Sequence, residues 1–162
     1  MVAFVRTKRE STERQAPPSP SGSGAESAFG RERRLRKRRE FLRVQDGARR
    51  VTSAHLVFLV AAREPPTGAA RLGLVVTRKI GVAVVRNRIK RVCRECFRLW
   101  PRLLPDGVDL VVIARSGAES LGLEGMRTEW SGVSGLLRRR AEEALARRGQ
   151  VPHLSGGRPR PR

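Results

Sequence analysis

Aromatic side chains are scarce in this sequence. Its 162 residues include five phenylalanines, two tryptophans and no tyrosine, so aromatic residues make up only 4% of the chain. A protein that stacks many successive nucleobases exposes a row of aromatic rings, and this composition argues against such a surface. Phe41 and Phe58 could each offer one ring for stacking, or each could belong to the hydrophobic core.

Long apolar segments are also missing. No run of about 18 apolar residues occurs, so the sequence predicts no membrane span. The first residues, Met1 to Arg6, lack the longer apolar stretch of a secretory signal. We therefore expect a cytoplasmic protein without a membrane partner.

Side chains that could carry catalysis or hold a metal are few. The two histidines, His55 and His153, are far apart in the sequence, and the two cysteines, Cys93 and Cys96, lie three positions apart. That cysteine spacing leaves a metal or redox site open, but no second pair exists, and on an apolar helix face cysteine behaves as a small hydrophobe. No Gly-rich phosphate loop of the Walker type occurs. We expect no catalytic side chain, no metal bound by the protein and no small-molecule substrate.

Acidic residues are greatly outnumbered by basic ones. The chain has 35 Lys and Arg against 15 Asp and Glu, a formal net charge of +20. Solubility of a small domain needs a net charge of only about 2–8. A larger excess repels itself unless a polyanion neutralises it, so nucleic acid is the expected partner.

Residues 86–98 concentrate this charge on a predicted amphipathic helix. At about 100° per residue, one side is apolar and the other is cationic. The apolar side holds Val85, Ile89, Val92, Cys93, Cys96, Leu99 and Trp100, and the cationic side holds Arg88, Lys90, Arg91, Arg94, Arg98 and Arg102. A solvated helix face usually mixes charges of both signs, whereas this one has only Glu95 among its cations. The pattern favours anion binding, because guanidinium groups hold phosphate oxygens in pairs and Asn87 adds a directional contact.

The remaining segments predict an α/β protein with one domain at residues 31–148. A short helix should end near Asp46, and apolar strands are expected at 54–62, 71–78 and 108–115, the first two as an antiparallel pair across a Pro/Gly loop. A second amphipathic helix is predicted from about 125 to 148, on the spacing of Met126, Trp130, Val133, Leu137, Ala141 and Leu145. The order strand, helix, strand implies a crossover within one sheet. Residues 1–30 are expected to be a disordered extension and 149–162 a flexible basic tail.

The segment from Val75 to Arg91, continuing through Arg94 to Arg98, closely resembles the protein subunit of bacterial ribonuclease P. A Lys-containing strand end, a Gly, an Ala-Val step and the Arg-Asn-Arg motif follow one another here in that family's order and spacing. The resemblance implies an α+β sandwich with a small mixed sheet, the element order αβββαβα, and a left-handed βαβ crossover through the Arg-Asn-Arg helix. That hand is rare, since such crossovers are right-handed in about 98% of cases.

The resemblance also implies a function. The protein would join a catalytic RNA, ribonuclease P RNA, and together they would remove the 5′ leader from precursor tRNA, an endonucleolytic reaction in which the RNA holds the Mg²⁺. The residues implied to bind RNA are Arg78, Lys79, Arg86, Asn87, Arg88, Lys90, Arg91, Arg94 and Arg98. Phe41 and the strand of Phe58 would form the leader cleft, although Gln45 stands where many members have a second aromatic residue. The alternatives are a non-enzymatic RNA-binding protein, such as an RNA chaperone or nucleoid protein, and a protein-only nuclease, which the lack of an acidic metal cluster disfavours.

Overall fold

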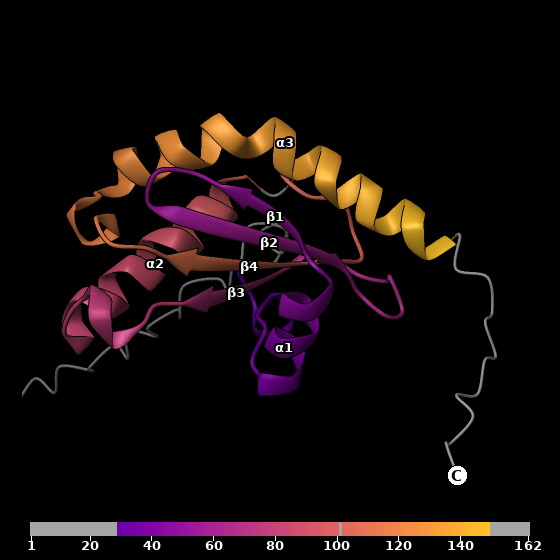
Figure 1. Ribbon diagram of the computed structural model, residues 1–162, viewed down its shortest axis with the longest axis horizontal. Coiled ribbons are helices and arrows are strands. Elements are labelled where there is room, and N and C mark those ends of the chain that lie inside the picture. Colours follow the sequence, from indigo (N-terminus) through magenta and orange to yellow (C-terminus); the bar gives the residue numbers. More distant parts are fainter. Residues whose placement is uncertain (1–28, 101, 150–162) are drawn as a thin grey trace, which may run out of the picture.

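The sheet of this protein lies between helices on both of its faces, as seen in the computed structural model, which describes residues 29–100 and 102–149 (Figure 1). Helices α2 and α3 cover one face and α1 covers the other. The elements in chain order are α1 (Arg38–Gly47), β1 (Arg49–Thr52), β2 (Leu56–Ala62), β3 (Arg71–Val75), α2 (Ala83–Leu99), β4 (Val108–Ala114) and α3 (Leu123–Gly149). This mixed α+β class and the predicted order of elements are confirmed.

The strands are arranged in the order β1-β2-β4-β3, which corrects one sequence prediction. β2 pairs with β1 and with β4, both antiparallel, and β3 pairs with β4 in parallel, while its other edge forms an isolated parallel bridge between Leu72 and Arg34. The expected antiparallel pair of β2 and β3 is therefore wrong, because β4 lies between them. Nearly every residue of β4 is buried, and a strand that is apolar on both faces is best shielded at the centre of a sheet. The crossover from β3 through α2 to β4 is present, and its left hand remains a prediction.

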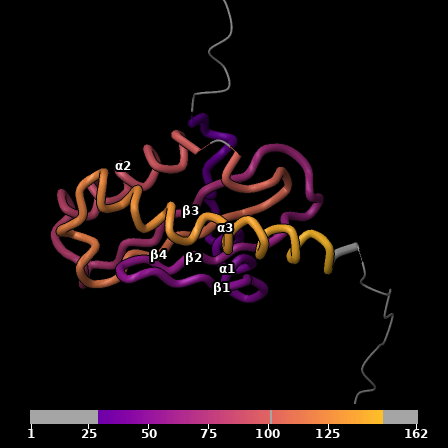
Figure 2. The backbone as a smooth tube through the Cα atoms, turned by 90° about the horizontal axis from the view of Figure 1, so that it is seen from above, coloured from indigo at the N-terminus to yellow at the C-terminus, as the bar shows by residue number. Residues whose placement is uncertain are grey.

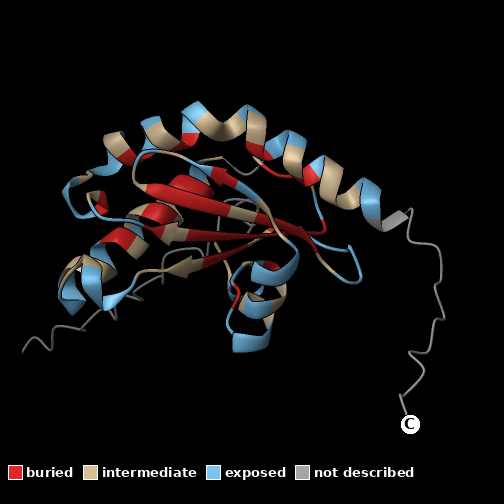
Figure 3. Cartoon of the chain, viewed as in Figure 1, coloured by how far each residue is buried: buried red, intermediate tan, exposed pale blue. Residues whose placement is uncertain are grey.

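The larger hydrophobic core fills the space between the sheet and helices α2 and α3. Trp130 of α3 is fully buried, and its ring makes edge-to-face contacts with Phe58 of β2 at 5.4 Å and with Phe97 of α2 at 6.4 Å between centroids. Figure 3 shows buried residues along the strands and exposed ones on the outer turns of the helices. The predicted stripe of α3 is confirmed: Met126, Trp130, Leu137 and Ala141 are buried and Val133 and Leu145 pack against them.

Helix α1 is held on the opposite face by a smaller core and by a network of ion pairs. Asp109 of β4 is fully buried and accepts hydrogen bonds from Arg43 of α1 at 2.8 Å and from Arg71 of β3 at 2.8 and 2.9 Å. Arg71 also donates to Glu40 of α1, at 2.8 Å. The Asp109 network, as we call Arg43, Asp109, Arg71 and Glu40, fixes α1 relative to two strands.

The ends of the described region differ slightly from the predicted domain limits. Phe29 packs edge-to-face on Phe97 at 5.6 Å between ring centroids, although residues 1–30 were assigned to the extension. The predicted disorder of residues 1–28 and the predicted tail at 150–162 lie outside the described residues. Within the part of the chain that is described, no helix combines the length and apolar character needed to cross a bilayer.

Candidate nucleic-acid interface

Helix α2 turns its cations away from the core because its apolar stripe is buried. Ile89, Cys93, Cys96 and Phe97 are at most 2% exposed. Phe97 replaces the predicted Leu99, which is 41% exposed, in that stripe. On the other side of the helix, Asn87, Arg88 and Arg91 are exposed and Arg86, Lys90, Arg94 and Arg98 are partly exposed.

Most of the cations on α2 have no acidic partner within the described residues. Within this helix, Arg98 forms an ion pair with Glu95. For Arg86, Arg88, Lys90, Arg91 and Arg94, no carboxylate of the described chain lies within ion-pair distance. A surface with so little internal compensation favours an external polyanion.

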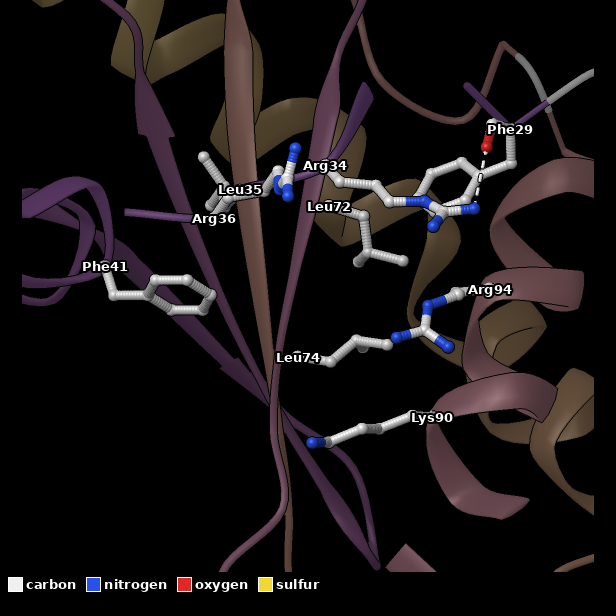
Figure 4. A pocket seen from close by; sticks show the side chains of 9 residues that line it. All are labelled: Phe29, Arg34, Leu35, Arg36, Phe41, Leu72, Leu74, Lys90 and Arg94. Atoms are coloured by element: carbon white, nitrogen blue, oxygen red, sulfur yellow. Dashed lines mark hydrogen bonds between the residues drawn. The ribbon is translucent and has the colours of Figure 1, made fainter. Parts of the chain in front are cut away.

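A pocket of about 240 Å³ lies between α1 and α2, over β3 (Figure 4). Lys90 and Arg94 reach into it from α2, and the ring of Phe41 borders it from α1. Its remaining lining comes from β3 and from the segment before α1: Phe29, Arg34, Leu35, Arg36, Leu72 and Leu74. The pocket thus joins an aromatic ring, apolar side chains and four cations, and none of its lining residues is acidic. We call it the α1–α2 pocket.

Like charges face each other inside this pocket. Burial lowers the pKa of Arg94, and the nearby charge of Arg34 lowers it further. Arg34 is held in position, because its guanidinium lies 4.9 Å from the centroid of the Phe29 ring and donates a hydrogen bond of 3.0 Å to the Phe29 carbonyl oxygen. An anion between the two guanidinium groups would relieve their repulsion, since each can hold oxygen atoms in pairs.

Gly73 of β3 allows Phe41 to lie against the sheet. A Cβ atom at this position would come within 2.7 Å of Phe41 Cε1 and 2.9 Å of Leu35 Cδ1. Any larger residue would therefore push the Phe41 ring or Leu35 away. No local sequence pattern indicates this packing, because it joins residues of α1 and β3 that are far apart in the chain.

The prediction that Phe58 lines the leader cleft is corrected, because Phe58 is a core residue. It is fully buried and packs on Trp130, on the face of the sheet opposite α1. Successive residues of a strand point to opposite faces, so it is Leu59, partly buried in the smaller core with Phe41, that faces α1. The Phe58 ring cannot stack on a nucleobase from this position.

The other predicted residues are distributed along the approach to α2. Arg78 and Lys79 are exposed on a 3-10 turn, Arg78–Ile80, that precedes the helix, and they do not line the pocket. Arg34 and Arg36 were missed as site residues, although the basic run 31–39 contains them. His55 is structural, as expected: its Nδ1 lies 2.5 Å from Glu129 of α3 and its backbone N–H donates to the same carboxylate at 3.1 Å.

The two cysteines belong to the core. Burial raises the pKa of Cys93 to about 12 and that of Cys96 to about 11, so neither is a thiolate at neutral pH. Among the residues that the structure describes, no group of three or more His, Cys, Asp or Glu side chains could hold a metal ion. The interpretation of both cysteines as members of the apolar stripe is confirmed.

The fold and this site define the class of protein. A cationic helix beside a cationic, partly aromatic pocket is typical of an RNA-binding protein. The family model described as Ribonuclease P matches residues 29–139. The chain therefore belongs to the ribonuclease P protein family. Membership confirms the resemblance found in the sequence and disfavours the general RNA chaperone and the protein-only nuclease.

Individual relatives and solved structures agree with this assignment. The chain is 48% identical over 88 residues to the ribonuclease P protein component of Gluconacetobacter diazotrophicus, covering 54% of this chain and 75% of that protein. It is 37% identical over 114 residues to the same component of a Geobacter species, covering 70% and 96%. Among solved structures, the ribonuclease P protein of Thermotoga maritima matches with a TM-score of 0.57 and 34% identity over 65% of this chain and 96% of that one. That of Staphylococcus aureus gives 0.59 and 28%, over 64% and 94%.

Proposed function

We propose that α2 and the α1–α2 pocket form the RNA-binding surface through which this chain serves as the protein subunit of a bacterial ribonuclease P. The partners are the catalytic RNA and precursor tRNA, in the cytoplasm. The protein is an accessory subunit of the ribonucleoprotein that removes the 5′ leader. The observation that carries the proposal is the pocket itself, where Lys90, Arg94 and Arg34 converge beside Phe41 without an acidic lining residue.

The two parts of the surface have different roles. The exposed side of α2, with Asn87, Arg88 and Arg91, contacts the phosphates of the catalytic RNA, because its cations point outward along one helix. The α1–α2 pocket holds the single-stranded leader, because a partly exposed ring can stack on one base while neighbouring guanidinium groups hold its phosphates. With one ring in place of a row, this contact is independent of leader sequence.

Magnesium ions belong to the RNA in this proposal. The described part of the protein offers no cluster of carboxylates for them, so the protein contributes positive charge and position. By neutralising phosphates, its cations reduce the repulsion between RNA strands that would otherwise require more Mg²⁺.

The test compares two double variants of the full-length protein. Lys90→Ala/Arg94→Ala removes two pocket cations, and Arg127→Ala/Arg138→Ala removes two exposed arginines of α3 that pair with Glu124 and Glu142. Each is assembled with a bacterial ribonuclease P RNA, and both the affinity for precursor tRNA and leader cleavage at low Mg²⁺ are measured over a series of salt concentrations.

We expect the pocket variant to bind precursor tRNA about ten-fold more weakly and to lose about 1–2 from the slope of log affinity against log salt, since each lost phosphate contact removes about 0.7–0.9. The α3 variant should resemble the wild type. Equal behaviour of the two variants would refute the pocket as an RNA site, and absence of any stimulated cleavage by the wild type would refute the function.

A further inference from the structure

A second cationic hollow lies at the opposite edge of the sheet from the α1–α2 pocket. It has a volume of about 390 Å³ and is bordered by three arginines, Arg43, Arg49 and Arg147, with Asp46 as its acidic member. Its floor consists of small residues, among them Ala61 and Ala62 at the end of β2. We call it the α1–α3 hollow. None of the residues predicted to bind RNA lines it.

The hollow is built from three distant parts of the sequence: the junction of α1 and β1, the end of β2 and the last turns of α3. The end of α1 leads directly into Arg49 at the start of β1, and α3 supplies Ala144 and Arg147 from its last turns. Figure 2 shows that the C-terminal end of α3 lies on the side away from α2. In Figure 1 that end extends to the right, past α1, which lies on the other side of the sheet.

The wall that α3 contributes lies outside the family match. The family model ends at residue 139, whereas α3 continues as a helix to Gly149. Ala144 and Arg147 therefore lie beyond the part of the chain that the family model matches. Leu145 packs against the main core, so the last turns of α3 are attached to the domain and keep Arg147 at a defined position.

All three arginines of the hollow remain at least partly exposed, although Arg43 and Arg49 lie near carboxylates. Arg43 is anchored by Asp109 at 2.8 Å, yet its side chain remains 39% exposed. Arg49 lies close enough to α3 that its charge helps to lower the pKa of Glu143, after the larger effect of the hydrogen bond from Arg140. Against three guanidinium groups the lining offers one carboxylate, Asp46. Small floor residues leave room for a bulky anion to approach all three arginines.

We propose that the α1–α3 hollow binds the phosphodiester backbone of RNA, as a second contact that the last turns of α3 help to form in the ribonuclease P complex. Guanidinium groups around a floor of small residues suit phosphate oxygens, which they bind in pairs. The proposal rests on the proposed function, because both surfaces serve the same assembly. Since α1 borders both the hollow and the α1–α2 pocket, RNA would contact the protein on two sides of this helix.

The experiment removes two arginines of the hollow in the full-length protein. Arg49→Ala/Arg147→Ala is compared with Arg49→Lys/Arg147→Lys, which keeps the charge, and with the Arg127→Ala/Arg138→Ala control. Affinity for a ribonuclease P RNA, and affinity of the assembled complex for precursor tRNA, are each measured against salt concentration. Circular dichroism at the assay temperature verifies that each variant is folded.

The alanine variant should bind one of the two RNAs about ten-fold more weakly, with a salt slope reduced by about 1–2, and the lysine variant should retain the slope. The RNA that is affected identifies which molecule occupies the hollow. Affinities and slopes equal to those of the control for both RNAs would overturn the proposal. The pocket variant Lys90→Ala/Arg94→Ala, measured alongside, separates the two failures: if only the pocket variant weakens binding, the proposed function stands without the second contact.

Discussion

The substitution Asp109→Asn tests the Asp109 network that holds α1, and with it Phe41, on the sheet. The Asp109 side chain is 1% exposed and accepts three hydrogen bonds, from Arg43 and Arg71. Asparagine has the same shape but no charge, and its amide N–H₂ would face guanidinium donors. Arg71, whose side chain is 15% exposed, would keep only Glu40 as an acidic partner.

The expected cost follows from the burial of these groups. Breaking a buried ion pair by removing one partner destabilises a protein by about 3–5 kcal/mol. Because Arg71 keeps its 2.8 Å ion pair with Glu40, we expect the lower end, about 3 kcal/mol. For a domain of this size that corresponds to a fall of about 10 °C in Tm.

Thermal and urea unfolding of the two proteins at pH 7 measures this cost. Asp106→Asn is the matched control, because Asp106 is exposed in the turn before β4 and surface substitutions usually change stability by less than about 0.5 kcal/mol. A loss of under about 1 kcal/mol for Asp109→Asn would refute the argument that this network anchors α1. The variant should also bind precursor tRNA more weakly, since α1 carries the Phe41 ring.

Two further predictions concern α1 and the core. Hydrogen bonds from the backbone N–H groups of Lys37 and Arg36 and the ion pair with Arg71 outweigh partial burial and lower the pKa of Glu40 from 4.5 to about 2. Because the folded-state pKa is the lower one, this stabilisation is complete above about pH 4.5 and is lost as the pH falls toward 2. Glu40→Gln should therefore cost on the order of 3 kcal/mol at pH 7 and should flatten the acid dependence of unfolding, whereas an unchanged pH profile would contradict the assignment. Phe58→Ala should cost about 3–5 kcal/mol of stability. Phe41→Ala should mainly lower the affinity for precursor tRNA, by about ten-fold, through lost stacking. Unfolding and binding are measured on both variants, and an exchange of the two effects would refute these roles.

The predictions from the sequence succeeded where a single element carries the signal. Helix α2 was predicted with its cationic and apolar sides because the 3.6-residue period is a local property, and the same holds for the stripe of α3. The error within α2 was small: Phe97 is buried and Leu99 is exposed, since the Phe97 ring packs edge-to-face on Trp130 of α3. The structural role of His55 also followed from its position in an apolar strand.

The predictions failed where the partner of an element decides the outcome. The sequence predicted that β2 and β3 pair across a loop, yet β4 lies between them. The central position stabilises β4 most, because this strand is buried on both faces. Phe58 could have faced either side of the sheet. The alternation of a strand determines which of its side chains share a face, but it does not determine which face packs against α1. The Asp109 network and the close approach of Phe41 to Gly73 join residues more than 30 positions apart, so no local sequence pattern predicts them.

The sequence by itself determined the class of this protein: a net charge of +20, a helix that is basic on one side, and a motif order shared with ribonuclease P proteins. These properties are local or compositional, so they do not depend on the fold. Only the tertiary structure decided which cations act together. Arg34 and Arg94 come together because the segment before α1 pairs with the edge of β3 beside α2. Arg49 and Arg147 line the same hollow because α3 extends over β1. Electrostatic and stacking interactions act over a few ångströms, so the sites exist only once the chain has brought these residues to the same place.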